Sequence, residues 1–512
     1  MKEKTLLIAV DLGTSLIKTG AYSLDGTCLA EASEPVKDER PAPGMFIQHG
    51  EELFESVVRC LAKTAQSLGD RAADVEAMAF TGQMAGFMGV DADWNDITTW
   101  SCSLDVRYMP YAVRQQQRLA DKFMSISGTN SPLMSAKFEW FRDEFPEESK
   151  KIEKYLMISG YVIGKLGKLP IEDACIDGSF VTWTGMGDIK NKQWSDEICG
   201  DIGMDRRYLP KIVDSDAICG YLDAEIAKQT GLRAGIPLVS GAGDKVGGCV
   251  GAGILDFGDM ILEAASYGAV SCMVKDFRPD NEEHYFDIIT SAKRGSFYAH
   301  KYSQASGIIQ DWFIDQMVKT DGLDRKAGYR AIEAEAANLP AGSGGMMAIG
   351  LLGGSAIPLD TSLKGMFMGH TLMHTKAHFF RALLESHAYD LGISIDRIAA
   401  KYPEYKLDHV KIIGGGAKSA MLTQILADVT GRTFERLNRS DSALWGAAIL
   451  AGSAIGAFPD MKETAHAHVA VKDVFRPDEK RYATYQKYKA LYKEFIPELH
   501  SFYDRLAAIE EG

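Results

Sequence analysis

The first apolar run of the chain, Leu6 to Val10, stops abruptly at Asp11 and is followed by a glycine and two hydroxyl residues, Gly13 to Ser15. A second strand-like run, Lys18 to Ser23, comes directly after them. This pattern predicts a β-hairpin with a carboxylate at the end of a buried strand and outward backbone N–H groups at its tip. Such a turn can hold a phosphate and its metal ion, which indicates a nucleotide-binding protein. An ordinary tight turn is the alternative.

Length and composition restrict the class of protein. A chain of 512 residues, 46% hydrophobic and 25% charged, predicts a globular protein of two domains. No apolar run approaches the roughly 18 residues of a membrane span, and the first residues lack the layout of a signal peptide, so we expect a cytoplasmic protein with no membrane partner. The net charge of −14 argues against a nucleic-acid partner.

Eight cysteines are scattered along the chain without a C-x-x-C pair. This spacing argues against a zinc site and against a disulfide framework. We expect free and mostly buried thiols.

Strand-like apolar runs alternate with helical stretches throughout, which predicts an α/β fold with helices covering the sheets. Helical periodicity is clearest in Phe379 to Asp396. Glu479 to Ile509 is also helical in composition, and its row of aromatic residues predicts a packing surface.

The pattern of the first hairpin returns in Met260 to Ser271, again as strand, small-residue turn and strand. Two such hairpins predict two related domains that face each other across a cleft. We place the boundary near residue 250, which gives domains of residues 1–250 and 251–512.

A strand that begins at Ile236 ends in Gly-Ala-Gly, and Asp244 follows at the start of a glycine-rich helix. Glycine in a helix costs about 1 kcal/mol relative to alanine, so Gly247 and Gly251 predict the close approach of a ligand or of the other domain. Asp244 is either a functional carboxylate or the N-cap of this helix.

A third segment places three glycines, Gly414 to Gly416, between the strand Val410 to Ile413 and a helix over Met421 to Val429. A flat or anionic ligand can lie directly on such a backbone at a helix N-terminus.

Together these segments resemble the FGGY carbohydrate kinases, a branch of the actin-like ATPase superfamily, and within them the xylulokinases most. The similarity covers nearly the whole chain and keeps the order of the family's motifs. The matching segments are Asp11 to Ser15, Gly82-Gln83-Met84, Gly243-Asp244, Ala265-Ser266, Gly365 to Gly369 and Gly414 to Ala417.

The resemblance implies two actin-like (ribonuclease H-like) ATPase domains with a cleft between them. It also implies transfer of the ATP γ-phosphoryl group to a hydroxyl of a small sugar, a ketose such as xylulose, with Mg²⁺ on the phosphates. Asp244 would be the catalytic base, and Asp11 and Asp244 would hold the metal ion. The implied ATP-binding residues are Gly13, Thr14, Ser15, Lys18, Ser266, Gly414, Gly415, Gly416 and Ala417. Asp428 would stabilise the adenosine loop rather than contact ligand.

The implied substrate-binding residues are Gln83, Met84, Ala85, Asp105, Asp244 and Lys245. Ala85 stands where many family members have histidine, and Lys245 replaces the usual amide after the catalytic aspartate. Lys245 either contacts the sugar or an acidic group on it, or points away on the helix surface. Its charge would lower the pKa of Asp244. Asp105 either contacts the sugar or forms a surface ion pair with Arg107.

These departures keep several functions open. The substrate is a ketose, another polyol, a sugar acid or an autoinducer-type carbohydrate. The alternative from another class is an actin-like ATPase without a sugar acceptor. The sequence leaves a homodimer open, and it favours a structural role for His378.

Overall fold

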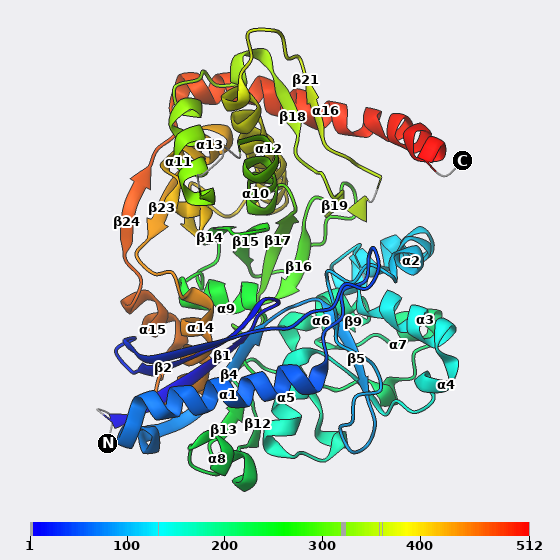
Figure 1. The fold of residues 1–512 in the computed structure, drawn as a ribbon, viewed down its shortest axis with the longest axis vertical. Coiled ribbons are helices and arrows are strands. Elements are labelled where there is room, and N and C mark those ends of the chain that lie inside the picture. The colour runs from blue at the N-terminus through cyan, green and yellow to red at the C-terminus, as the bar shows by residue number, and fades with distance from the viewer. Residues whose placement is uncertain (1–3, 132, 319–323, 358, 361, 511–512) are drawn as a thin grey trace.

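The computed structural model describes residues 4–131, 133–318, 324–357, 359–360 and 362–510. Each half of the chain contains one large sheet with helices around it (Figure 1). The order of the first sheet is β12 (Ile218–Tyr221), β13 (Pro237–Val239), β4 (Val75–Gly82), β1 (Leu6–Leu12), β2 (Leu16–Ser23) and β3 (Cys28–Pro35). The order of the second is β24 (Val471–Phe475), β23 (Thr433–Leu437), β22 (His409–Ile413), β14 (Met260–Ala264), β15 (Gly268–Val274), β17 (Phe297–Ser303) and β16 (Asp287–Thr290).

The two sheets have the same plan. In each, a hairpin of two antiparallel strands, β1–β2 or β14–β15, continues into a third antiparallel strand. On its other side the first hairpin strand pairs in parallel with β4 or β22, and a further parallel strand and an antiparallel edge strand follow. The predicted hairpins and their internal similarity are therefore confirmed.

The helices used below are α1 (Gly50–Leu68), α2 (Met109–Lys122), α3 (Met134–Glu144), α6 (Gly178–Thr184), α7 (Asp196–Ile202), α9 (Asp244–Gly251), α12 (Lys376–Lys401), α13 (Ala420–Thr430), α14 (Ser442–Ala454), α15 (Met461–Ala467) and α16 (Glu479–Glu510). The predicted helices over 379–396, 421–429 and 479–509 lie within α12, α13 and α16. His378 closes a capping box with Thr375 at the start of α12, as its expected structural role requires.

Helix α14 returns from the second half of the chain to the first sheet, where it packs on β1 and β4 and against α9. Figure 1 shows α9 and α14 together where the two halves meet. A Cβ atom on Gly251 would lie 1.9 Å from the Ser442 oxygen, and one on Gly446 would lie 1.9 Å from the Gly247 oxygen. The glycines of α9 thus let a second helix approach to backbone contact, which confirms the close approach predicted for them.

The remaining expectations about packing also agree with the structure. In α16, Tyr485 and Tyr492 are fully buried, whereas Tyr482 is exposed, so part of the predicted aromatic row forms packing surface. All eight cysteines are free, and most are buried. Among the described helices, none combines the length and the apolar character that a membrane crossing requires.

The contact between α9 and α14 predicts a difference between two glycine substitutions. Gly446→Ala should lower the free energy of unfolding by about 1–3 kcal/mol, because the added methyl group meets backbone that has to move. Gly200→Ala, in α7, is the control, since its methyl group meets no atom within 4 Å. The control should gain up to about 1 kcal/mol from helix propensity. Urea unfolding followed by circular dichroism measures both, and equal effects would refute the backbone contact.

Candidate active site

The tip of the first hairpin, Gly13 to Ser15, is fixed through its carbonyl oxygens. Gln48 Nε2 donates to the Thr14 oxygen (2.8 Å), and Gln83 Nε2 donates to the Gly13 oxygen (3.3 Å). The backbone N–H of Val36 donates to the Ser15 oxygen (3.0 Å). The donors are the residues that directly follow β3 and β4 and a residue before α1, while Ser15 itself is exposed. The tip is therefore rigid without using its side chains.

Asp11 is the second-last residue of β1, opposite Lys18. Burial, and then the negative charges of Asp244 and Glu263, raise the pKa of Asp11 to about 7, against the opposing charges of Lys18 and Lys245. Three carboxylates from three elements therefore share one region. This donor set suits a hard divalent cation, which takes oxygen ligands and favours the ionised carboxylates.

Asp244 is the first residue of α9, and Gly243 is the N-cap of that helix. Asp244 Oδ1 accepts a hydrogen bond from the neighbouring backbone N–H of Lys245 (2.7 Å). The alternative that Asp244 caps the helix is therefore wrong. Burial raises the pKa of Asp244; Lys245 lowers it as expected, but this effect is smaller than that of burial, and Glu263 adds to the rise.

Lys245 Nζ donates to Glu263 Oε2 at 2.7 Å, and this ion pair joins α9 to β14 of the second sheet. Burial alone would lower the pKa of Lys245, but Glu263 and Asp244 raise it well above its usual value. Glu263 was not among the residues predicted from the sequence. A signal was present, because Glu263 is the second-last residue of β14, as Asp11 is of β1. The position in the second hairpin that is equivalent to Asp11 therefore points to Glu263.

The second hairpin tip and the glycine loop lie together at the end of β14. The Ser266 oxygen accepts from the N–H of Ile308 (2.8 Å), and the Ser266 side chain is exposed. A Cβ atom on Gly414 would lie 2.5 Å from the Ala264 oxygen, so the glycine loop packs directly beside this tip. The structure thus brings Ser266, predicted to bind phosphate, close to the glycine loop predicted to bind adenosine.

Within the glycine loop, Gly414 and Gly415 are exposed, and a Cβ atom on Gly415 would meet open space. Ala417 is buried below them. Asp428 is buried in α13, where it accepts hydrogen bonds from the N–H of Asp478 (2.8 Å) and from Arg481 Nε (2.6 Å). These bonds join α13 to the start of α16, so a role of Asp428 in stabilising the adenosine loop stays a prediction.

On the predicted sugar side, Gln83 and Met84 connect the first hairpin to the turn before α9. The N–H of Gln83 donates to the Leu12 oxygen (3.1 Å), and its Oε1 accepts from Trp100 Nε1 (3.3 Å). The Met84 side chain lies against Gly243, where a Cβ atom would come within 2.4 Å of it. Ala85 follows and is half-buried.

Asp105 is fully buried, so it is not the surface ion pair given as its alternative. Arg107 donates to both carboxylate oxygens, from Nε (2.8 Å) and Nη2 (2.7 Å), and Ser101 Oγ donates to Oδ2 (2.7 Å). Burial favours a raised pKa, yet Arg107, Lys137 and Ser101 together lower the pKa of Asp105. Asp105 therefore fixes the guanidinium of Arg107, and its contact with sugar stays a prediction.

Lys137 of α3, which was not predicted from the sequence, binds the segment of residues 101–105 through hydrogen bonds. Its buried ammonium donates to Ser101 Oγ (2.7 Å), to the Cys102 oxygen (2.9 Å) and to the Asp105 oxygen (3.1 Å). Burial lowers the pKa of Lys137 to about 7, although Asp105 opposes the shift.

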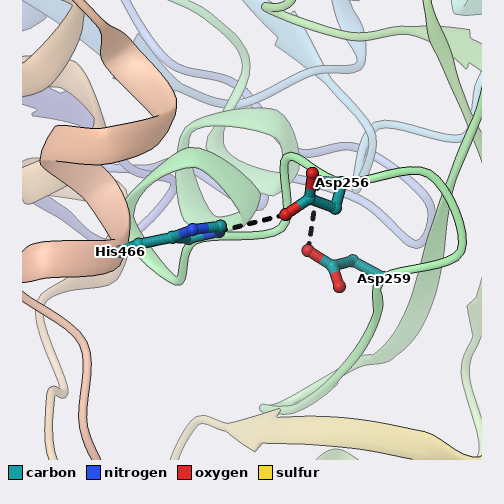
Figure 2. A group of neighbouring side chains, drawn as sticks. All are labelled: Asp256, Asp259 and His466. Atoms are coloured by element: carbon teal, nitrogen blue, oxygen red, sulfur yellow. Dashed lines mark hydrogen bonds and ion pairs between the residues drawn. The ribbon is translucent and has the colours of Figure 1, made fainter.

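Another group of metal-binding residue types, Asp256, Asp259 and His466, lies between α15 and the turn after α9 (Figure 2). Lys462 already pairs with Asp256, and His466 Nε2 lies 3.1 Å from the Gly253 oxygen. These partners make the group a contact between two segments, separate from the carboxylates at Asp11.

The raised pKa of Asp11 predicts a pH-dependent effect on stability. Between about pH 4 and pH 7 the unfolded chain loses this proton while the folded chain keeps it, so stability falls as pH rises. Without metal or nucleotide, Asp11→Asn should raise the melting temperature, and more at pH 8 than at pH 5.

The control is Asp25→Asn. Hydrogen bonds from Ser23 and Thr27 lower the pKa of Asp25 to about 2, so this carboxylate stabilises the fold at every pH above about 4 and loses that effect only below it. Its replacement should lower the melting temperature equally at pH 5 and pH 8. Differential scanning calorimetry measures both variants, and an Asp11→Asn gain that does not grow with pH would contradict the assignment.

Comparison with known proteins identifies relatives across the whole chain. The xylulose kinase of Bacillus subtilis (strain 168) is 27% identical over 494 residues, 95% of each chain. The autoinducer-2 kinase of Klebsiella pneumoniae subsp. pneumoniae is 24% identical over 522 residues, covering 99% of this chain and 95% of the relative. The solved structure of gluconate kinase from Lactobacillus acidophilus superposes with a TM-score of 0.88 at 21% identity, covering 98% of this chain and 99% of the other. This superposition confirms the predicted two-part α/β fold of the actin-like sugar kinases.

Two family domains cover most of the chain in the expected order. Residues 6–251 match the N-terminal domain of the FGGY family of carbohydrate kinases, and residues 265–455 match its C-terminal domain. FGGY kinases are sugar phosphotransferases that use ATP and generally a divalent metal. With its paired hairpins, its aspartate at the head of α9 and its glycine loop in the family's order, the chain belongs to the FGGY family of carbohydrate kinases.

Proposed function

We propose that this kinase transfers the γ-phosphoryl group of ATP to a hydroxyl of a ketose such as xylulose. The observation that carries this proposal is that the carboxylates of Asp244, Asp11 and Glu263 interact with one another. They come from α9 and from the two equivalent hairpins, which are segments that match the sugar-kinase motifs. The relative named xylulose kinase supports the ketose.

In the proposed reaction Asp244 accepts the proton of the sugar hydroxyl as it attacks the γ-phosphorus. A base works best when its pKa lies near the working pH, and burial moves the pKa of Asp244 upward from the range of an exposed aspartate. The first turn of α9 fixes the carboxylate, because its Oδ1 is bound to the adjacent N–H of Lys245.

The phosphates of ATP would lie between the two hairpin tips. The first tip offers Gly13, Thr14 and Ser15, with Lys18 on the neighbouring strand, and the second offers Ser266. In phosphoryl transfer the protein mainly positions the reactants and stabilises charge, and rigid backbone tips suit that task. Gly414 to Gly416 would carry the adenosine on exposed backbone, with Ala417 packed below.

We assign the divalent metal as Mg²⁺, held by Asp11 and Asp244, in part through water. The crowded carboxylates fit it, because their repulsion decreases when a cation binds. When bound, the metal neutralises charge on the phosphates.

On the sugar side, Gln83, Met84, Ala85, Asp105 and Lys245 are the proposed contacts. The cationic Lys245 that follows the base also favours a sugar acid as a second candidate, and the relative named autoinducer-2 kinase keeps an autoinducer-type carbohydrate open. We retain residues 1–250 as the sugar-side domain with the first phosphate motif, and residues 251–512 as the ATP-side domain. A homodimer and a cytoplasmic location stay predictions.

Release of ADP in the presence of a panel of pentuloses, polyols and sugar acids tests the proposed function. We expect turnover only with an acceptor sugar, and fastest with a ketose. ATP hydrolysis at the same rate without sugar would indicate an actin-like ATPase instead. A sugar acid as the best acceptor would replace the ketose in this proposal.

Asp244→Asn should lower kcat by about 10²–10⁴-fold, because the amide cannot accept the proton. Nucleotide affinity, measured by calorimetry without a divalent metal, should change by less than about threefold, since the adenosine loop lies on the second sheet. Asp256→Asn, outside the site, is the matched control and should keep the wild-type kcat. Near-normal turnover of Asp244→Asn would show that another group is the base.

A further inference from the structure

The two hairpins differ in how they neutralise their equivalent carboxylates. Asp11 and Glu263 are both the second-last residue of the first hairpin strand. Opposite Asp11 the first hairpin carries its own cation, Lys18, whereas opposite Glu263 the second hairpin carries Ala269. Glu263 therefore needs a cation from elsewhere in the chain.

Lys245 supplies that cation from α9, at 2.7 Å between Nζ and Oε2. The side chains of Lys245 and Glu263 are only 14% and 28% exposed. Partial burial reduces the screening of this pair by water, so it is stronger than an ordinary surface salt bridge. Because its two residues lie on α9 and on the second sheet, the pair also depends on how the two halves of the chain are placed.

Lys245 has other acidic neighbours within its electrostatic reach. Its charge acts on both Asp11 and Asp244, which are anionic groups of the proposed site. Lysine carries its charge on a flexible four-carbon chain and can exchange one carboxylate partner for another. An ammonium paired with Asp244 would occupy the oxygen that has to accept the proton.

We propose that Glu263 is a positioning residue for phosphoryl transfer: it holds the Lys245 ammonium away from Asp244 and thereby leaves the Asp244 carboxylate free to accept the proton of the sugar hydroxyl. This inference rests on the proposed function, in which Asp244 is the base. It assigns Glu263 no contact with substrate.

The test is a double-mutant cycle in the full-length enzyme, with kcat and the KM for sugar measured for each variant. Glu263→Gln keeps the shape of the side chain and removes its charge, so Lys245 turns to Asp244 and kcat should fall by about tenfold or more. Adding Lys245→Gln removes the displaced cation. The double variant should recover kcat to within about threefold of the Lys245→Gln single variant.

A split between kcat and KM separates the two roles of Lys245. If Lys245 also contacts the sugar, Lys245→Gln raises the KM for sugar in both backgrounds, whereas the recovery of kcat still reports on Asp244. Glu283→Gln is the matched control, since Glu283 is a carboxylate of the same half that pairs with Lys493 at the surface (2.8 Å). It should leave kcat unchanged.

Two results would overturn the inference. The first is a Glu263→Gln variant with wild-type kcat, and the second is a double variant as slow as Glu263→Gln alone, which would mean that Glu263 acts directly on ATP or metal. If Glu263→Gln fails to fold, Glu263→Asp, which shortens the reach by one methylene, should give a smaller fall that Lys245→Gln again reverses. Sugar-dependent turnover of the wild type together with an inactive Asp244→Asn variant keeps the proposed function intact in either case.

Discussion

The backbone contact between α9 and α14 is the constraint on which the rest of the structure depends. Gly247 and Gly251 of α9 meet Ser442 and Gly446 of α14 at distances that leave no room for a side chain. Because α14 also packs on β1 and β4, this contact fixes α9, and with it Asp244, against the first sheet. A bulkier residue at any of these glycines would move the head of α9 away from the hairpin that carries Asp11.

The duplicated sheet explains why the site is so acidic. Equivalent positions of the two hairpins carry Asp11 and Glu263, and the start of α9 adds Asp244. In a ligand-free protein this arrangement is unfavourable, since burial and mutual repulsion raise the pKa of Asp11 to about 7. Sites that bind a cation and phosphates often have such unfavourable electrostatics, which the ligands then relieve. Lys18 and Lys245 offset part of the repulsion, one within its own hairpin and the other from α9 to the second sheet.

Local patterns predicted much of this site, and long-range contacts account for what they missed. The hairpin tips, the glycine loop and the aspartate before the glycine-rich helix were visible because each motif occupies a few consecutive residues. Asp105 was harder to interpret, since its burial depends on Arg107 and on Lys137, which reaches the same segment from α3. The pairing of Lys245 with Glu263 could not be predicted from spacing, because it requires the position of α9 relative to the second sheet.

By itself the sequence determined the two-hairpin α/β plan, the family and the segments proposed to carry its chemistry, because those depend on short-range periodicity and on glycines whose backbone has to be approached closely. Only the tertiary structure decided which charges face one another. In that structure α14 packs on the first sheet, Asp105 is buried and bound to Arg107, and Glu263 Oε2 lies 2.7 Å from Lys245 Nζ. The physical reason is that electrostatic interactions depend on distance and burial in three dimensions, and neither quantity follows from the separation of two residues along the chain.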